Sequence, residues 1–128
     1  GEDRVLAYEY ALKTLTDNFN KYPYDARTAT YLGHVLDTAP LGVAVDDSFD
    51  KEVLDRAIAL SPLRAQAWYM TVNISLRKAD VLSEWSPERE VYYREAIKIL
   101  EEYSAKEPSL PVPRYILATI YYKLGDKV

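Results

Sequence analysis

The stretch that decides the fold is residues 59–69, which read Ala-Leu-Ser-Pro-Leu-Arg-Ala-Gln-Ala-Trp-Tyr. This stretch closes one amphipathic pattern and opens another within a few residues. We interpret Ser61-Pro62 as the start of the second helix, because serine caps unsatisfied N–H groups and a proline in the first turn has no N–H to lose. So short a connection predicts two neighbouring antiparallel helices.

Helical periodicity extends over the rest of the chain. Apolar residues recur at three- and four-residue intervals from Tyr8 to Phe19 and from Ala96 to Tyr103, as on one face of a helix. The chain has no alternating apolar pattern and no Asn-Gly or Asp-Gly turn, which are the signals of strands and hairpins. The sequence therefore predicts an all-α chain of about six helices, at residues 3–21, 26–38, 48–60, 62–80, 87–106 and 111–124.

Helix-breaking and helix-capping residues mark the ends of these segments. Asp25 is placed to cap the second helix, and one of Asp46, Asp47 and Ser48 to cap the third. Ser86-Pro87 repeats the Ser61-Pro62 signal. The final helix is expected to end at Gly125-Asp126, where glycine suits a left-handed cap.

Composition excludes several classes of function. The chain has 16 Lys and Arg against 20 Asp and Glu, a net charge of −4, and no basic block, so a nucleic-acid surface is not expected. It has no cysteine, which excludes disulfides and thiolate chemistry and leaves the compartment open. No apolar run reaches the length of a membrane span. The chain starts at Gly1 rather than Met, and we expect a fragment of a larger protein.

The segment ends resemble the tetratricopeptide repeat, a helix–turn–helix unit of about 34 residues. Prolines 23, 62 and 108 each follow an amphipathic helix. Leu32-Gly33 and Leu117-Ala118 match the Leu-Gly place of the repeat, and Trp68 its tryptophan place. Ala11 with Leu15, and Ala96 with Leu100, match its A-x₃-F places. In such a hairpin, a small residue lets two helices approach closely.

This resemblance implies a single domain over residues 1–128, a right-handed solenoid of stacked antiparallel hairpins. Residues 3–21 would be the second helix of a partial repeat, 26–60 and 62–106 two full repeats, and 111–124 the first helix of a further one. The sequence departs from the tetratricopeptide pattern in two ways. The prolines lie 39 and 46 residues apart, and Thr71-Val72 stands where Leu-Gly is expected. An unrelated helical bundle therefore remains the alternative. Uncapped apolar ends are predicted, through which the chain could self-associate.

A finer resemblance rests on Pro23-Tyr24-Asp25-Ala26-Arg27, Leu32-Gly33 and the run from Ala59 to Tyr69. These segments look like the repeat regions that follow the membrane part of bacterial O-antigen ligase or polymerase family proteins. The resemblance implies a parent that handles lipid-linked polysaccharide, with this stretch as an extracytoplasmic accessory domain. The catalytic residues of such a parent would lie in its membrane part.

No motif for catalysis, metal binding or a cofactor is recognised. His34 is the only histidine, and Asp37 is the only carboxylate at helical spacing from it, so a metal site there is not expected. Asp46, Asp47 and Asp50 lack the glycine and distal glutamate of a calcium loop, and helix capping explains them better. We expect no enzyme activity from this chain.

Helical phase within the repeat selects side chains for the concave face of the predicted stack. We expect a peptide with an acidic group to lie near Arg77 and Lys123. The alternative is a solvated face that binds nothing by itself. The predicted binding residues are Arg27, Thr30, His34, Asp37, Gln66, Tyr69, Asn73, Arg77, Tyr115, Thr119, Tyr122 and Lys123.

Tyrosine is the compositional outlier, with 12 residues. We expect about two-thirds of them in the core and the others on a recognition surface. The expected function is that of a non-catalytic scaffold that binds protein or peptide. The alternative is an accessory domain of a glycan-transfer protein that contacts polysaccharide, with Trp85 as the exposed stacking residue and Trp68 as a packing residue.

Overall fold

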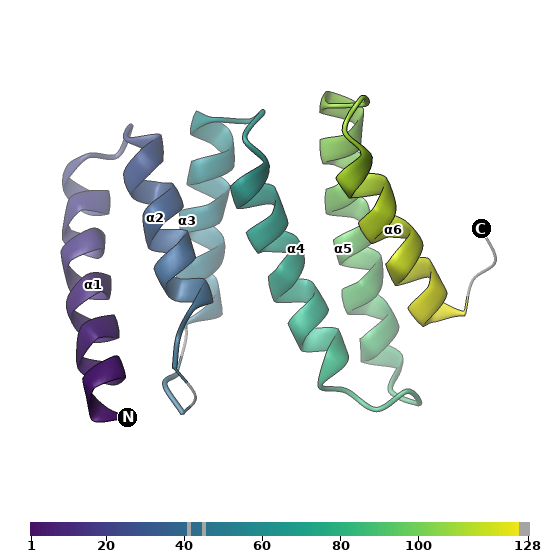
Figure 1. Cartoon of the computed structure of the whole chain (residues 1–128), viewed down its shortest axis with the longest axis horizontal. Coiled ribbons are helices and arrows are strands. Elements are labelled where there is room, and N and C mark those ends of the chain that lie inside the picture. Colours follow the sequence, from purple (N-terminus) through teal and green to yellow (C-terminus); the bar gives the residue numbers. More distant parts are fainter. Residues whose placement is uncertain (41, 45, 126–128) are drawn as a thin grey trace. The chain divides into compact units, whose positions relative to one another are not determined.

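The computed structural model describes residues 1–40, 42–44 and 46–125. The chain forms two compact units, Gly1–Met70 and Thr71–Val128. Over the described residues the chain is all-α, with six helices and no strand (Figure 1). The helices are α1 (Glu2–Lys21), α2 (Ala26–Asp37), α3 (Asp47–Leu60), α4 (Ala65–Asp80), α5 (Pro87–Lys106) and α6 (Pro111–Leu124).

Five of the six predicted segments agree with the structure within one residue at each end. The start of α4 was predicted wrongly, because Ser61-Pro62 does not open it. Ser61 ends α3, and its carbonyl accepts a hydrogen bond from the Arg64 N–H at 3.1 Å. Pro62 lies inside this turn, where its fixed φ is equally favourable. Helix α4 therefore begins three residues later than predicted, at Ala65.

The predicted caps on α2 and α3 are confirmed. The Asp25 carboxylate accepts hydrogen bonds from the N–H groups of Arg27 and Thr28. Asp46, one of three candidates, accepts from Ser48 and Phe49. These carboxylates satisfy N–H groups that the first helical turn leaves unpaired. At the other end of the chain, Gly125 ends α6 in the left-handed conformation, at φ 77°, as expected; Asp126 lies outside the described residues.

In the first unit, α2 packs against both α1 and α3 (Figure 1). Gly33 makes the close approach to α3 possible, since a Cβ atom there would lie 2.7 Å from Cδ2 of Leu54. Phe19 of α1 is fully buried and meets Phe49 edge to face. Burying one such side chain stabilises the fold by about 1.5–3 kcal/mol. Gly33 thus agrees with the expectation from the sequence that a small residue lets two helices of a hairpin pack closely.

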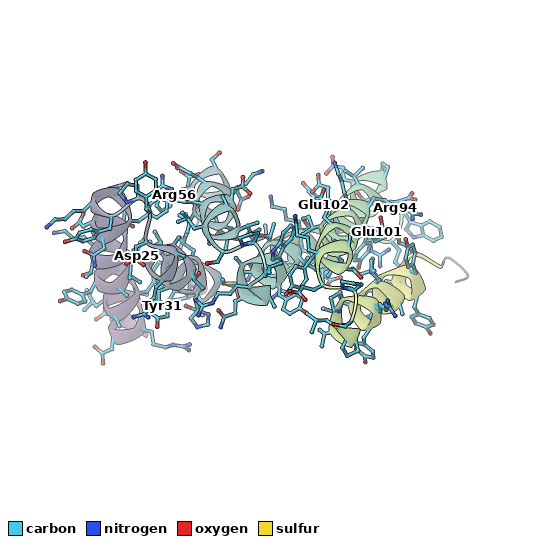
Figure 2. The ribbon with its side chains drawn as sticks, turned by 90° about the horizontal axis from the view of Figure 1, so that it is seen from above. Asp25, Tyr31, Arg56, Arg94, Glu101 and Glu102 are labelled. Atoms are coloured by element: carbon cyan, nitrogen blue, oxygen red, sulfur yellow. The ribbon has the colours of Figure 1, made fainter. Side chains whose placement is uncertain are left out.

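Arg56 of α3 covers the outer edge of this core (Figure 2). Its guanidinium lies 3.7 Å from the centre of the Phe19 ring and donates a hydrogen bond to the Phe19 carbonyl at 3.2 Å. That carbonyl belongs to the last turn of α1, where helical partners are lacking. A single side chain thus ties the end of α1 to α3 by stacking and by a hydrogen bond.

In the second unit, α5 packs against α6 (Figure 1). Its core consists of Tyr93, Leu100 and Tyr103 from α5 and Ile120 from α6, all almost fully buried. Tyr93 and Tyr103 occupy core positions that are usually filled by wholly apolar side chains. The hydroxyl of a buried tyrosine needs a polar partner, and that of Tyr93 finds one in Asp80.

Candidate interaction surfaces

The outer face of α2 carries exposed polar and aromatic side chains. Arg27 and His34, two of the predicted binding residues, are exposed. Tyr31 lies between them in the sequence, with 56% of its surface exposed, and is labelled in Figure 2. These three positions lie four and three residues apart, so they share one side of the helix. The face thus offers a cation, an aromatic ring and an imidazole in one row, Arg27, Tyr31 and His34, here named the α2 stripe.

Two predicted binding residues of α2 lie off the α2 stripe. Thr30 is buried, and its hydroxyl donates to the Ala26 carbonyl at 2.8 Å, a bond that threonine commonly makes within helices. Asp37 is half-buried. The prediction missed Tyr31, which is one position from Thr30; the exposed positions of α2 recur at i, i+4 and i+7, and that phase could have located it.

The predicted residues of α4 divide between the two units. Gln66 is exposed in the first unit and Tyr69 is half-buried there, where burial raises the pKa of its phenol. Asn73 and Arg77 are exposed in the second unit. Each unit therefore presents its own part of the predicted set.

The predicted residues of α6 are all exposed. Tyr115, Thr119 and Tyr122 follow each other on one face of the helix, and the Thr119 hydroxyl donates to the Tyr115 carbonyl at 3.1 Å. Lys123 differs, because its ammonium lies 3.3 Å from the Asp80 carboxylate. A carboxylate of the same unit thus already neutralises one of the two cations that were expected to hold an acidic group.

Asp80 is the centre of a polar cluster that joins α4, α5 and α6 within the second unit. Its carboxylate accepts a hydrogen bond from the Tyr93 hydroxyl at 2.5 Å and one from Lys123. Burial alone would raise the pKa of Asp80, but these hydrogen bonds and the charges of Lys123 and Arg89 outweigh it and lower the pKa. Burial and the neighbouring Asp80 charge raise the pKa of Tyr93. The Asp80 cluster thus links α4, α5 and α6 by hydrogen bonds.

The tyrosines are distributed differently from the prediction of a two-thirds core share. Only Tyr8, Tyr93 and Tyr103 are buried, and half of the twelve are exposed. The exposed ones are Tyr10, Tyr22, Tyr24, Tyr31, Tyr115 and Tyr122. Helical periodicity could not separate them, because a tyrosine fits both a core position and a surface one. Exposed tyrosines give large contact area at little entropic cost.

Two acidic groups near the start of α3 have different environments. Asp46 caps the helix, and Asp50 is buried beside Tyr8. Burial and the Asp50 charge together raise the pKa of the Tyr8 phenol. Over the described ranges, no group of three His, Cys, Asp or Glu side chains could hold a metal ion.

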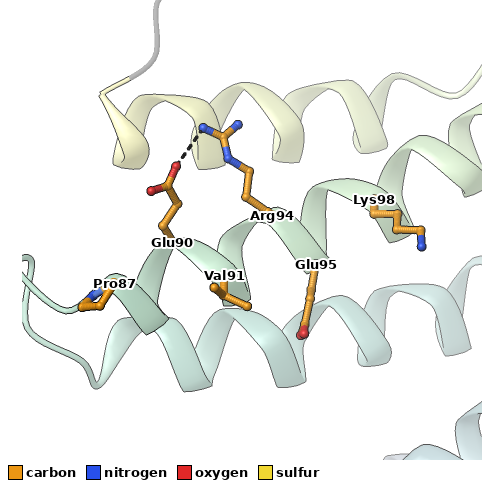
Figure 3. A pocket seen from close by; sticks show the side chains of 6 residues that line it. All are labelled: Pro87, Glu90, Val91, Arg94, Glu95 and Lys98. Carbon is orange, nitrogen blue, oxygen red and sulfur yellow. Dashed lines mark hydrogen bonds and ion pairs between the residues drawn. The ribbon is translucent and has the colours of Figure 1, made fainter.

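A shallow hollow of about 450 Å³ runs along α5 (Figure 3). Its lining comes from this helix alone, through residues spaced three and four apart. Glu90 pairs with Arg94, one helical turn away, at 3.2 Å. A hollow with one helix for a wall encloses no ligand in the way binding clefts do. Its lining residues are Pro87, Glu90, Val91, Arg94, Glu95 and Lys98.

The two tryptophans have opposite environments. Trp68 of α4 is buried, and its indole N–H donates to the Pro62 carbonyl at 2.9 Å. Trp85, in the connection from α4 to α5, is 91% exposed. Both placements agree with the sequence prediction of one packing and one exposed tryptophan.

No protein-family model, curated protein or solved structure matches this chain. Among the described residues, no helix combines the length and apolar character that a membrane span requires.

Proposed function

We propose that this chain is a helical-repeat interaction domain of the tetratricopeptide kind, which binds polypeptide and does no chemistry. The observation that carries the proposal is the α2 stripe, where Arg27, Tyr31 and His34 stand exposed in one row while the opposite side of α2 is buried. The close approach at Gly33, with Leu32 before it, supports the repeat assignment. In this proposal the hairpins stack as a right-handed solenoid.

The ligand that fits the α2 stripe is an extended peptide with a carboxylate. Arginine binds a carboxylate with two parallel hydrogen bonds, and a neighbouring tyrosine supplies apolar contact at low entropic cost. We place the acidic group of the peptide at Arg27, because Lys123 is already paired with Asp80. The predicted contact at Gln66, which lies in the same unit as the α2 stripe, remains part of the proposal. Asn73, Arg77 and Tyr115 belong to the second unit and remain separate predictions.

A peptide-display selection on the purified chain tests this proposal. Selected peptides should be rich in Asp or Glu, and Tyr31→Ala with Arg27→Ala should weaken their binding about tenfold or more. The matched control is Tyr24→Ala, since Tyr24 is even more exposed but lies in the turn before α2. Equal loss in the control, or no loss in the double variant, would remove the α2 stripe as the binding surface.

A second candidate function rests on Trp85. An exposed indole in a helix connection is suited to stacking on a sugar ring, as the resemblance to O-antigen ligase repeat regions implies. Because Trp68 is buried, a fluorescence change on adding bacterial polysaccharide would come from Trp85. The change should vanish in Trp85→Phe; unchanged fluorescence of the wild-type chain would leave the peptide-binding proposal alone.

A further inference from the structure

Three short turns of this chain share one geometry. In each, a proline is the second of four residues, and the N–H of the fourth residue donates to the carbonyl of the first. The fixed φ of proline suits the second place of such a turn. The hydrogen bonds run from Asp25 to Tyr22, from Arg64 to Ser61 and from Leu110 to Glu107, at 3.1, 3.1 and 3.2 Å.

The third place of the turn holds a large apolar side chain in the first unit and a small polar one in the second. Tyr24 and Leu63, each directly after the proline, are 87% and 59% exposed. Ser109 stands at the same place of the turn from α5 to α6 and is exposed as well. Because serine suits this place, the turn itself does not require a large apolar residue there.

The two turns of the first unit lie at the same end of that unit (Figure 1). Arg56 donates to the Phe19 carbonyl at 3.2 Å, which places the end of α3 beside the last turn of α1. Tyr22, which is 50% exposed, adds a second tyrosine to this end. The surface is here named the turn tip, and it consists of Lys21, Tyr22, Tyr24, Leu63 and Arg64.

Both turns have a fixed backbone. The indole N–H of Trp68 donates to the Pro62 carbonyl at 2.9 Å, and the Asp25 carboxylate accepts from the N–H groups of Arg27 and Thr28. A surface that is already ordered loses little conformational entropy when it binds. The turn tip therefore presents its exposed side chains ready for contact.

The charges of the first unit are separated along its helices. Within residues 21–27 and 61–64, the cations are Lys21, Arg27 and Arg64, and the only acid is Asp25, which caps α2. At the opposite end, where α1 and α3 begin, residues 1–4 and 46–50 have Glu2, Asp3, Asp46, Asp47 and Asp50 against Arg4. The turn tip thus lies in a positive region of a chain with a net charge of −4.

We infer that the turn tip docks on the surface of a membrane that contains anionic lipid. Tyrosine suits the boundary between headgroups and acyl chains, because its ring is apolar and its hydroxyl bonds to water. Lysine and arginine lay their stems along apolar surface and keep their charge at the level of the phosphates. A projecting turn does not enclose a peptide as a concave site does, whereas it can enter the headgroup region.

This inference goes beyond the proposed function and rests on a different surface. The α2 stripe runs along the side of one helix, whereas the turn tip lies at the end of the hairpins. Arg27 stands near both surfaces and is left unchanged in the test. Tyr31→Ala should weaken peptide binding and leave membrane binding unchanged, so the failure of one proposal does not decide the other.

Co-sedimentation of the whole chain with vesicles of phosphatidylcholine and phosphatidylglycerol in equal parts tests the inference. The wild-type chain should bind, and added salt should weaken the binding. Tyr24→Ser combined with Leu63→Ser should lower the partition coefficient about tenfold or more. The matched control is Tyr10→Ser, at a tyrosine that is 75% exposed on α1 away from both turns, and it should change nothing. Circular dichroism should show the same helix content in all variants, since serine already occupies this turn place at Ser109.

A second pair of variants tests the role of charge. Lys21→Gln combined with Arg64→Gln should also lower the partition coefficient about tenfold or more, and vesicles of phosphatidylcholine alone should bind the wild-type chain more weakly by a similar factor. A wild-type chain that binds neither kind of vesicle would overturn the inference. So would binding that the Tyr24→Ser and Leu63→Ser pair leaves unchanged, or binding that is equal for the two lipid compositions.

Discussion

The two units hold their helices together by different means. In the first, α2 meets α3 through Gly33 and Leu54, and Arg56 covers the Phe19 ring, so the contacts are close packing and stacking. In the second, Tyr93 brings a hydroxyl into the core and Asp80 receives it, with Lys123 at the rim. Close packing tolerates no added volume, whereas a polar cluster at the surface depends on charge and therefore on pH.

The largest effect is expected where packing is closest. Gly33→Leu places a whole side chain against Leu54 and should lower the free energy of unfolding by about 2 kcal/mol, as overpacking of a core does. Ala118→Leu, at the matching place of α6, should stay within about 0.5 kcal/mol of the wild type because that place is exposed. Urea denaturation followed by circular dichroism at low protein concentration measures both.

Equal losses at the two places would break the comparison, because they would show that Ala118 is covered in solution. A stable Gly33→Leu variant would mean that Leu54 moves aside at little cost.

A smaller effect is expected in the second unit. Tyr93→Phe removes the hydrogen bond to Asp80 and should cost about 1 kcal/mol near neutral pH, since water reaches the Asp80 side chain, which is 47% exposed. The pKa of Asp80 is lowered in the folded chain. Its contribution to stability is therefore present above the ordinary pKa of an aspartate and is lost as pH falls through the lowered folded-state pKa.

The difference in stability between wild type and Tyr93→Phe should accordingly shrink in acid. Carboxyl NMR titration should show the pKa of Asp80 moving up in the variant, because one of the bonds that lowers it is gone. A difference that does not depend on pH would assign the role of Tyr93 to packing alone.

The smallest effect is expected at the surface of α3. Lys51 and Asp55 form an ion pair of 2.7 Å one helical turn apart, with side chains 73% and 55% exposed. Lys51→Ala should change the free energy of unfolding by about 0.5 kcal/mol or less, and added salt should reduce even that. A loss as large as that of Tyr93→Phe would show that the pair belongs to a network and not to a solvated surface.

The sequence predicted the helices well because their signals are local. Apolar periodicity and the caps at Asp25, Asp46 and Gly125 depend only on neighbouring residues. Ser61-Pro62 led to a wrong start for α4, because the same dipeptide suits both the start of a helix and a tight turn. The hydrogen bond from the Arg64 N–H to the Ser61 carbonyl shows that it forms a turn here.

The candidate surfaces were harder to predict, because exposure depends on which helices meet. Thr30 and Tyr31 are neighbours on α2, yet one is buried and the other exposed. From the sequence, Lys123 was expected to be a cation available to a ligand. Its partner Asp80 lies 43 residues away in the chain, so local spacing does not indicate the pair. The polar cluster around Asp80 therefore carried no sequence signal that spacing could reveal.

The most direct test of the interaction-domain account is an NMR titration of the isotope-labelled chain with an acidic peptide taken from the display selection. The account predicts that amide shifts change along the α2 stripe, at Arg27, Tyr31 and His34, and that Tyr31→Ala abolishes those changes. Shift changes centred on Trp85 or on α5, with the α2 stripe unaffected, would contradict it.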